Sequence, residues 1–285
     1  MNIKKRIKKN TSSLEGKRIA VSGATGGLGR ELCLYIASLG GDLVLVVRNT
    51  KKSEMLEREL KEKYPNTSVF HVKADMEDTE SVMKAADELI DLGIDILFLN
   101  AGAYSIPRHK TAAGYDNVFT INYLSPYVLA KKLLPHLRQR GGRIVAVGSI
   151  AHRYSASDPR DVDFSTRKAS NLVYGNSKRY LMATLPALAE REGEINIVHP
   201  GITFTNITAH YPKVVFAIIK YPMKVIFMSP KRAALSLLEG IFTDCGEDEW
   251  IGPWLFDVWG LPKKKKFKIP PNELSEMRNF AEKNF

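Results

Sequence analysis

The stretch SGATGGLGRE, residues 22–31, decides how the rest of the chain is interpreted. It follows the apolar run RIAVSG at 18–23 and opens a segment of helical periodicity that extends over 28–40. A strand, a glycine-rich turn and a helix N-terminus together make a phosphate site. Glycines let the backbone approach the anion, and the free N–H groups stabilise its charge. The position of this turn, directly after the first predicted strand, therefore indicates a bound phosphate group.

Apolar runs and helical patterns alternate along the remainder of the chain. Strands are predicted over 18–23, 42–47, 67–72, 94–100, 142–149 and 195–201, with a last strand starting at Trp250. Helices are predicted over 28–40, 51–64, 76–93, roughly 111–139 and about 174–192. Strands rich in Val and Ile and separated by helices indicate a parallel sheet covered on both faces. The sequence therefore predicts a single α/β domain built on a doubly wound parallel sheet of the Rossmann type.

The composition is ordinary for a soluble globular protein: the chain has 285 residues, of which 44% are hydrophobic and 26% charged. Two cysteines, Cys33 and Cys245, give no disulfide framework and favour a reducing cytosol. Six scattered histidines without ligand-like spacing predict no metal site. We therefore expect a cytoplasmic protein without a bound metal ion.

Much of the net charge of +11 lies in two runs, MNIKKRIKKN at 1–10 and KKKKFK at 263–268. The first run has no aromatic residue, the second has the single Phe267, and neither belongs to a recognisable binding fold, so we expect no nucleic-acid partner. The apolar stretch 214–228 is too short to span a bilayer, but it is amphipathic enough to lie on a membrane surface. Two interpretations stay open. The runs are solvated tails beside a partly buried lid, or they add attraction to a peripheral membrane contact.

The end of the second predicted strand, VVRNTKK, indicates which dinucleotide the phosphate site accepts. An acidic residue there would bind a free ribose 2′-hydroxyl, whereas an arginine accommodates a 2′-phosphate. Arg48 stands at this position, and no Asp or Glu follows before Glu54. The sequence therefore favours NADP(H) over NAD(H).

Two segments place a tyrosine and a lysine four residues apart, YVLAK at 127–131 and YGNSK at 174–178. Residues i and i+4 share one helix face, so the ammonium can lie near the phenol oxygen and stabilise its phenolate. Lowering the phenol pKa by about three units requires ~4 kcal/mol, roughly what one charge at ~4 Å supplies at an effective dielectric of about 20. We expect one pair to carry acid–base chemistry with a lowered tyrosine pKa, but the spacing alone does not say which.

Five motifs occur in one order: SGATGGLG, LNAG at 99–102, Ser149, YGNSK, and HPG at 199–201. Together they resemble the short-chain dehydrogenase/reductase family over roughly residues 17–260. The family's usual NNAG is LNAG here, a departure at Leu99. In the family the tyrosine follows the strand that ends at the serine. The resemblance therefore implies that Tyr174 is the reactive tyrosine and that Tyr127 and Lys131 are a pair on a helix surface.

The resemblance also implies a role for each catalytic residue. Tyr174 would protonate a carbonyl oxygen in reduction or deprotonate an alcohol in oxidation, and Ser149 would orient the carbonyl. Lys178 would also bind the nicotinamide ribose, and Asn122 would support a proton-relay water, whereas His152 is given no role. The residues expected to bind the cofactor are Ser22, Gly23, Thr25, Gly27, Leu28, Gly29, Arg48, Asp75, Asn100, Ala101, Gly102, Tyr174, Lys178, Pro200 and Gly201.

The long interval between Ser149 and Tyr174, which starts with SIAH, and the apolar 214–228 segment resemble the retinol-dehydrogenase-like branch of the family. This likeness implies a small lipophilic alcohol or carbonyl as substrate, such as a retinoid or steroid. A homo-oligomer is a further expectation, because dimers and tetramers are usual for the family. The expected division of the chain is a basic leader at 1–16, a dinucleotide-binding and catalytic domain at 17–260 with a substrate lid near 203–228, and a basic C-terminal extension at 261–285.

Other functions stay open. A β-ketoacyl reductase would use the same residues, and its basic surface could attract an acidic carrier protein. Reduction of an activated carbon–carbon double bond is less consistent with Ser149 and the four-residue step from tyrosine to lysine. A non-catalytic NADP-binding sensor would share the glycine turn without needing Tyr174.

Overall fold

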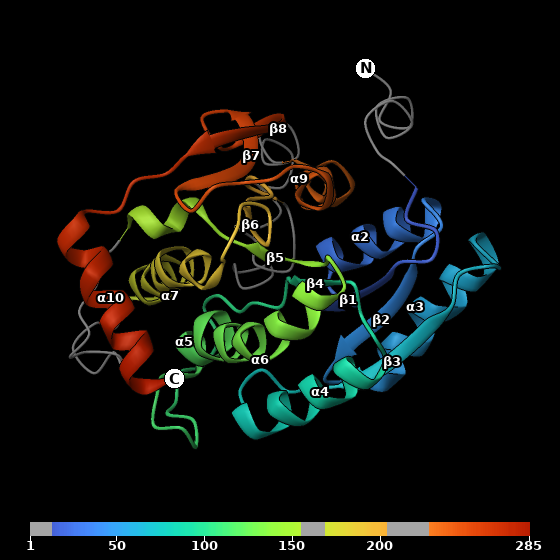
Figure 1. The fold of residues 1–285 in the computed structure, drawn as a ribbon, viewed down its shortest axis with the longest axis horizontal. Helices are drawn as coiled ribbons and strands as arrows, with labels where there is room; N and C mark the ends of the chain where they lie inside the picture. The colour runs from blue at the N-terminus through green and yellow to red at the C-terminus, as the bar shows by residue number, and fades with distance from the viewer. Residues whose placement is uncertain (1–12, 155–168, 204–227) are drawn as a thin grey trace, which may run out of the picture.

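Within the described residues, one sheet of eight strands has the spatial order β3-β2-β1-β4-β5-β6-β7-β8 (Figure 1). Strands β1 to β7 pair in parallel, and β8 pairs antiparallel to β7 at the edge. The computed structural model describes residues 13–154, 169–203 and 228–285. The strands are β1 (Arg18–Ser22), β2 (Asp42–Val47), β3 (Val69–Lys73), β4 (Ile96–Leu99), β5 (Arg143–Val147), β6 (Ile195–Val198), β7 (Glu249–Leu255) and β8 (Trp259–Lys266).

Helices cover both faces of the sheet (Figure 1). One face packs against α2 (Gly27–Ser38), α3 (Thr50–Lys63) and α9 (Pro230–Phe242). The other packs against α4 (Thr79–Asp91), α6 (Ser125–Gln139), α7 (Ser170–Thr184) and α10 (Pro271–Asn284). Short helical segments are α5 (Asn117–Phe119), the π-helix η1 (Thr120–Leu124), and the 3₁₀ helices η2 (Ile150–Arg153) and η3 (Pro186–Leu188). The predicted α/β fold with a doubly wound sheet is confirmed.

Local sequence explains these elements. Helix α4 starts after Asp78, whose carboxylate accepts hydrogen bonds from the backbone N–H groups of Glu80 and Ser81. Its buried residues Val82, Ala85, Ala86 and Leu89 recur at helical spacing and face the sheet. Every residue of β4 is buried, as expected for a parallel strand covered on both faces.

Strand β1 lies between β2 and β4, so the order of strands along the sheet reverses at this point. In open α/β sheets, ligands bind beyond the carboxyl ends of the strands at such a reversal. The segments that follow β1, β4, β5 and β6 carry the predicted glycine turn, LNAG, Ser149 and HPG. The fold therefore brings these four motifs to one edge of the sheet, and the fifth, YGNSK, lies on α7.

The helix predicted over 111–139 begins later than expected. Asp116 forms an isolated antiparallel bridge with Lys110, and Gly114 between them has a φ of +83°, which is incompatible with a right-handed helix. Asp116 then caps α5 by accepting from the N–H groups of Val118 and Phe119. A π-helical turn at η1 follows, in which the N–H of Ser125 bonds to the carbonyl of Thr120.

The helix predicted over about 174–192 also has different bounds. Helix α7 runs over Ser170–Thr184, because Pro186 follows and has no N–H to continue the hydrogen-bond ladder. The earlier start adds a full turn before Tyr174, so this residue lies inside the helix and not at its first position.

Strand β8 runs across residue 260, the predicted end of the catalytic domain. The lysine run, for which a solvated tail and a membrane contact both stayed open, lies on this edge strand of the sheet. Three of its lysines meet acidic partners: Lys264 pairs with Glu249 (2.9 Å), Lys265 with Asp257 (2.6 Å) and Lys266 with Asp248 (3.0 Å). Lysine on an edge strand also discourages pairing with another sheet.

Helix α10 is likewise part of the fold. Met277 and Ala281 are buried in the core, and the rings of Phe280 and Phe285 pack against Tyr115. The predicted 261–285 extension therefore completes the hydrophobic core on the α7 side of the sheet.

Two expectations lie largely outside the described residues. The leader is described only from residue 13, where Leu14 is buried, and the predicted lid is described only at Thr203 and Met228, which form a parallel bridge. In the ranges that the structure describes, no helix combines the length and the apolar character needed to cross a bilayer.

Candidate active site

The glycine turn leaves a bare helix N-terminus at the carboxyl edge of the sheet. Gly23 has a φ of +64°, and a Cβ there would lie 2.9 Å from the Cα of Ala101, so only glycine fits. Helix α2 starts at Gly27 and its cap residue Gly26 provides no side-chain hydrogen bond. Gly26 and Gly27 are exposed, and the neighbouring Thr25 and Leu28 are partly buried. The unpaired N–H groups at this helix end are available to an anion.

The side chains of Ser22 and Asn100 stabilise this turn through hydrogen bonds to the backbone. The Ser22 hydroxyl donates to the carbonyl of Phe98 (3.1 Å) and accepts from the N–H groups of Asn100 and Ala101 (3.0 Å each). The Asn100 side-chain amide donates to the carbonyls of Ser22 (2.9 Å) and Gly23 (3.2 Å). The hydroxyl of Ser22, which the sequence assigned to cofactor binding, is therefore used within the protein, where it ties β1 to β4.

Arg48 and Asp75 lie together at the ends of β2 and β3. The guanidinium of Arg48 is 3.8 Å from the carboxylate of Asp75, and 70% of the Arg48 side chain is exposed. An ion pair this exposed contributes little to stability. Arg48 is therefore free to turn toward a bound anion.

Ser149, Tyr174 and Lys178 converge at the ends of β5 and α7. The Ser149 side chain lies close enough to the Tyr174 phenol to affect its pKa, and the Ser149 hydroxyl accepts from the N–H of Ala151 (3.2 Å). The Lys178 ammonium donates to the carbonyl of Val147 (2.7 Å) and lies 5.9 Å from the centre of the Tyr174 ring. Three of the four predicted catalytic side chains therefore lie together here.

The predicted lowering of the tyrosine pKa is wrong for this structure. Burial raises the pKa of Tyr174 to about 12, against the opposing effect of the nearby Ser149 side chain. Burial also lowers the pKa of Lys178 to about 8. The sequence argument placed the ammonium about 4 Å from the phenol oxygen and neglected desolvation, but Lys178 directs its ammonium to a backbone carbonyl.

Asn122 joins the π-helical turn to the loop after β4. Its side-chain amide donates to the carbonyls of Ala103 and Val118 (2.8 Å each), and its carbonyl oxygen accepts from the N–H of Ala103 (3.2 Å). The side chain is fully buried beside Gly102. π-Helical turns occur often at functional sites, and this one places Asn122 within the catalytic region.

Pro200 and Gly201 extend the site from the end of β6. Gly201 has a φ of +81°, and a Cβ there would lie 2.7 Å from the carbonyl oxygen of Val258. The N–H of Ile202 donates to the same carbonyl (3.3 Å). The turn between β7 and β8 therefore packs directly against the predicted nicotinamide side.

Sequence reasoning missed three residues around the catalytic side chains. The ring of Tyr104 packs edge-on against Tyr174, with 5.2 Å between centroids. His152, which was given no role, is buried and its Nδ1 donates to the carbonyl of Ser149 (2.7 Å). Arg179 then donates to the carbonyl of His152 (2.9 Å) and pairs with Glu273 on α10 (2.8 Å). The SIAH motif contains His152 and was the available signal for this residue. No local pattern connects Arg179 to Glu273, because 94 residues separate them.

The second tyrosine–lysine pair has no place in this site. Tyr127 is buried in the core, 6.1 Å from the ring centre of Phe285, and burial raises its pKa. Lys131 donates to the carbonyl of Phe285 (2.9 Å). This pair therefore anchors the end of α10.

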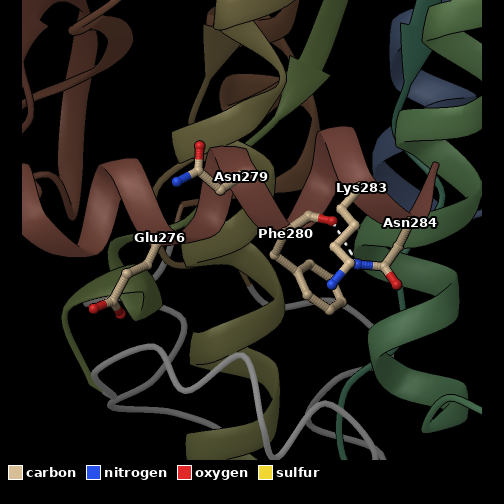
Figure 2. Close-up of a pocket in the computed structure, with 5 residues that line it drawn as sticks. All are labelled: Glu276, Asn279, Phe280, Lys283 and Asn284. Atoms are coloured by element: carbon tan, nitrogen blue, oxygen red, sulfur yellow. Dashed lines mark hydrogen bonds between the residues drawn. The ribbon is translucent and has the colours of Figure 1, made fainter.

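A groove on α10 lies apart from the catalytic residues. Figure 2 shows its lining side chains on the outer part of the helix, with the Asn284 amide donating to the carbonyl of Phe280 (2.7 Å); the lining residues are Glu276, Asn279, Phe280, Lys283 and Asn284. None of these residues was predicted as a site residue, so the groove adds nothing to the catalytic edge.

A sequence profile of the family described as short chain dehydrogenase matches residues 17–214, well over half of the chain. The chain belongs to the short-chain dehydrogenase family. The resemblance seen in the five ordered motifs is thereby confirmed. The fold described above is that of a short-chain dehydrogenase.

Curated short-chain dehydrogenases similar to this chain include several retinol dehydrogenases. Retinol dehydrogenase 12 of Mus musculus is 29% identical over 202 residues, which cover 68% of this chain and 64% of the relative. Retinol dehydrogenase 13 of Homo sapiens is 28% identical, and the alignment covers 70% of this chain and 62% of the relative. The chain thus spans slightly less than two thirds of these relatives. Retinol dehydrogenase 11 of Mus musculus is 28% identical over 87% of this chain and 88% of its own.

Solved structures show the same fold. An uncharacterised protein from Mycobacterium Paratuberculosis matches with a TM-score of 0.73 and 22% identity, covering 96% of this chain and 94% of its own. The NADPH-dependent 3-quinuclidinone reductase from Rhodotorula Rubra matches with a TM-score of 0.63 and 22% identity. The match covers 82% of this chain and 89% of the reductase chain. At these identities the likeness supports the architecture and not a shared substrate.

The carboxyl edge fits the nicotinamide dinucleotide that short-chain dehydrogenases bind. The bare N-terminus of α2 would hold the pyrophosphate, because the turn at Gly23 leaves its N–H groups uncapped. Arg48 and Asp75 at the adjacent strand ends would meet the adenosine half. Lys178 and Gly201 would lie on the nicotinamide side.

Proposed function

We propose that this protein is an NADP(H)-dependent oxidoreductase that interconverts a carbonyl group and an alcohol on a small lipophilic substrate. The observation that carries the proposal is that Ser149, Tyr174 and Lys178 lie together at the carboxyl edge of the sheet, with Ser149 close enough to the phenol to affect its pKa. Two neighbouring hydroxyls at this edge can both contact one substrate oxygen.

In the reductive direction, each side chain has a defined task. The nicotinamide supplies the hydride that becomes the new C–H bond, as the cofactor's own chemistry. Tyr174 donates its phenolic proton to the carbonyl oxygen, which completes the alcohol. Ser149 donates a hydrogen bond to the same oxygen and holds it beside the phenol. Lys178, buried and tied to Val147, keeps a cation near the phenolate that remains.

Tyr174 is in the protonated form that reduction requires. With a pKa of about 12, the phenol carries its proton at neutral pH, whereas oxidation of an alcohol would use the phenolate.

Two further features support the choice of cofactor and substrate. Arg48 stands exposed at the end of β2, the position from which a cation meets a ribose 2′-phosphate. The relatives named retinol dehydrogenases support a lipophilic alcohol or aldehyde as substrate. A lid over residues 203–228 and peripheral contact with a membrane remain part of this proposal.

The test is NADPH consumption with a panel of carbonyls, comparing Tyr174→Phe with Tyr127→Phe. Retinal, steroid ketones, a β-ketoacyl thioester and small sugars form the panel. We expect turnover of the lipophilic carbonyls, a loss of about 10²–10⁴-fold in kcat for Tyr174→Phe, the range of a general acid, and near-normal kcat for Tyr127→Phe.

The outcomes separate the alternatives. Turnover of the acyl thioester alone would favour a β-ketoacyl reductase, and turnover of sugars alone would contradict a lipophilic substrate. NADPH binding without any turnover would favour a sensor. Equal activity in the two variants would overturn the assignment of Tyr174.

A further inference from the structure

Three aromatic side chains stand exposed on adjacent loops beside the site. Phe256 is 85% exposed on the turn between β7 and β8, Trp254 is 55% exposed near the end of β7, and Tyr154 is 51% exposed just after η2. Among the described residues, the one other large hydrophobic side chain that is comparably exposed is Met55 on α3. We call Tyr154, Trp254 and Phe256 the aromatic rim.

Charged contacts hold these loops together. The carboxylate of Asp257 accepts from Arg153 (3.1 Å) and from Lys265 (2.6 Å), so the residues next to Tyr154 and Phe256 are bonded to each other. Nearby, the guanidinium of Arg232 lies over the ring of Trp259, 4.6 Å from its centre. Three cations and one carboxylate therefore surround the aromatic rim, a local excess of positive charge.

The backbone of the turn holds Phe256 outward at a cost to folding. Phe256 has a φ of +50° and Asp257 a φ of +60°, a conformation that non-glycine residues seldom adopt and that costs on the order of 1–3 kcal/mol each. Exposing the Phe256 ring forgoes roughly the further 1.5–3 kcal/mol that burial of such a side chain contributes. Neither the backbone conformation of this turn nor the exposed Phe256 ring stabilises the fold. Both features therefore indicate a binding role and not a structural one.

Size and chemistry favour a lipid surface over a protein partner. An aromatic side chain buries about 150–250 Å² at most, so three partly exposed rings offer only a few hundred Å², below the ~800 Å² that each partner buries in a stable protein interface. A bilayer needs no complementary partner surface. Tyr154 and Trp254 combine an apolar ring with a polar group, which suits the boundary between headgroups and acyl chains. The wholly apolar ring of Phe256 would lie on the acyl-chain side of that boundary.

The rim also lies at the mouth of the catalytic site. The turn that carries Phe256 contacts Gly201 through Val258 and Pro253, and Tyr154 packs next to Gly175, the neighbour of Tyr174. A membrane held by these loops would lie beside the entrance for a lipophilic substrate.

We propose that the aromatic rim is a docking surface for a bilayer that contains anionic phospholipid. This surface is separate from the basic runs at the two ends of the chain, and its binding does not depend on catalytic turnover.

The test is sedimentation of the full-length protein with vesicles at about 0.15 M salt, comparing Phe256→Ser with Met55→Ser. Both variants remove one exposed apolar side chain, but Met55 lies on α3, away from the rim. With vesicles of phosphatidylcholine and phosphatidylserine, we expect Phe256→Ser to weaken partitioning about tenfold or more, while Met55→Ser binds like the unmodified protein. Circular dichroism confirms that both variants are folded.

Tryptophan fluorescence provides a local readout. Of the three tryptophans, Trp250 is buried, Trp259 is partly buried beneath Arg232 and Trp254 is exposed. We expect the emission to shift to shorter wavelength on adding vesicles, and the part of this shift that disappears in Trp254→Phe reports on Trp254. Equal partitioning of Phe256→Ser and Met55→Ser would overturn the proposal, as would a failure of the unmodified protein to bind vesicles. Binding of equal strength to pure phosphatidylcholine would overturn the part assigned to the cations. A dimer that dissociates on Phe256→Ser would show that the rim binds a second copy of the chain.

Discussion

At the scale of single residues, burial controls the chemistry of the site more than proximity of charge does. Tyr174 and Lys178 are shifted in opposite directions, toward neutral phenol and neutral amine, because both lose water on folding. The spacing of four residues brought the two side chains to one helix face, as the sequence indicated. Whether the ammonium reaches the phenol or a backbone carbonyl was decided by β5, which provides the carbonyl of Val147.

Arg48→Ala tests the choice of cofactor at this scale. Arg48 is largely exposed and pairs only loosely with Asp75, so its removal should leave the fold intact. We expect the KM for NADPH to rise about tenfold or more, the effect of losing one charge-assisted contact to a phosphate, with little change in the KM for NADH. Steady-state kinetics with both cofactors measure this. An equal rise in both KM values would show that Arg48 does not distinguish the 2′-phosphate.

At the scale of elements, the C-terminal strand and helix connect to the catalytic loop. Helix α10 reaches Ser149 through Glu273, Arg179 and His152, each bonded to the next. The ring of Phe267, just after β8, also packs against His152 at 6.1 Å. Phe267 and Glu273, both close to the C-terminus, therefore help to position the loop that carries Ser149.

Glu273→Gln tests this connection. Without the carboxylate, Arg179 loses its charged partner, and the loop that carries Ser149 should be held less firmly. We expect kcat to fall roughly tenfold, as small misplacements of a catalytic group do, with the KM for NADPH unchanged. Glu276→Gln, on the same helix but facing the groove of Figure 2, is the control. Equal kcat values for the two variants, or a loss explained by a lower melting temperature, would contradict a positioning role.

At the scale of the whole molecule, two buried histidines link stability to pH. His152 and His199 both pack against Trp250, and burial lowers the pKa of each to about 4. Above pH 6.5 both are neutral in the folded and unfolded chains, so their full contribution is present. As pH falls toward 4, the unfolded chain binds protons that the folded chain does not, and stability is lost.

Denaturant unfolding between pH 7 and pH 5 measures this effect. We expect each histidine to remove about 2 kcal/mol from the free energy of unfolding at pH 5. In His152→Asn, whose amide can replace the Nδ1 donor to Ser149, the dependence on pH should be smaller by about that amount. His109→Asn, at an exposed residue, is the control and should keep the original dependence. An unchanged slope in His152→Asn would contradict the prediction.

By itself, the sequence determined the parallel sheet and the glycine turn at Gly23, because both rest on local periodicity, and motif order predicts Tyr174 over Tyr127 as the reactive tyrosine. It misjudged the ends of two helices and the direction of the Tyr174 pKa shift. Only the tertiary structure decided that β8 is an edge strand, that α10 completes the core and that Glu273 lies beside Arg179. Desolvation, ion pairing and edge-strand contacts depend on which segments distant in the sequence are packed together. The local sequence pattern does not contain that information.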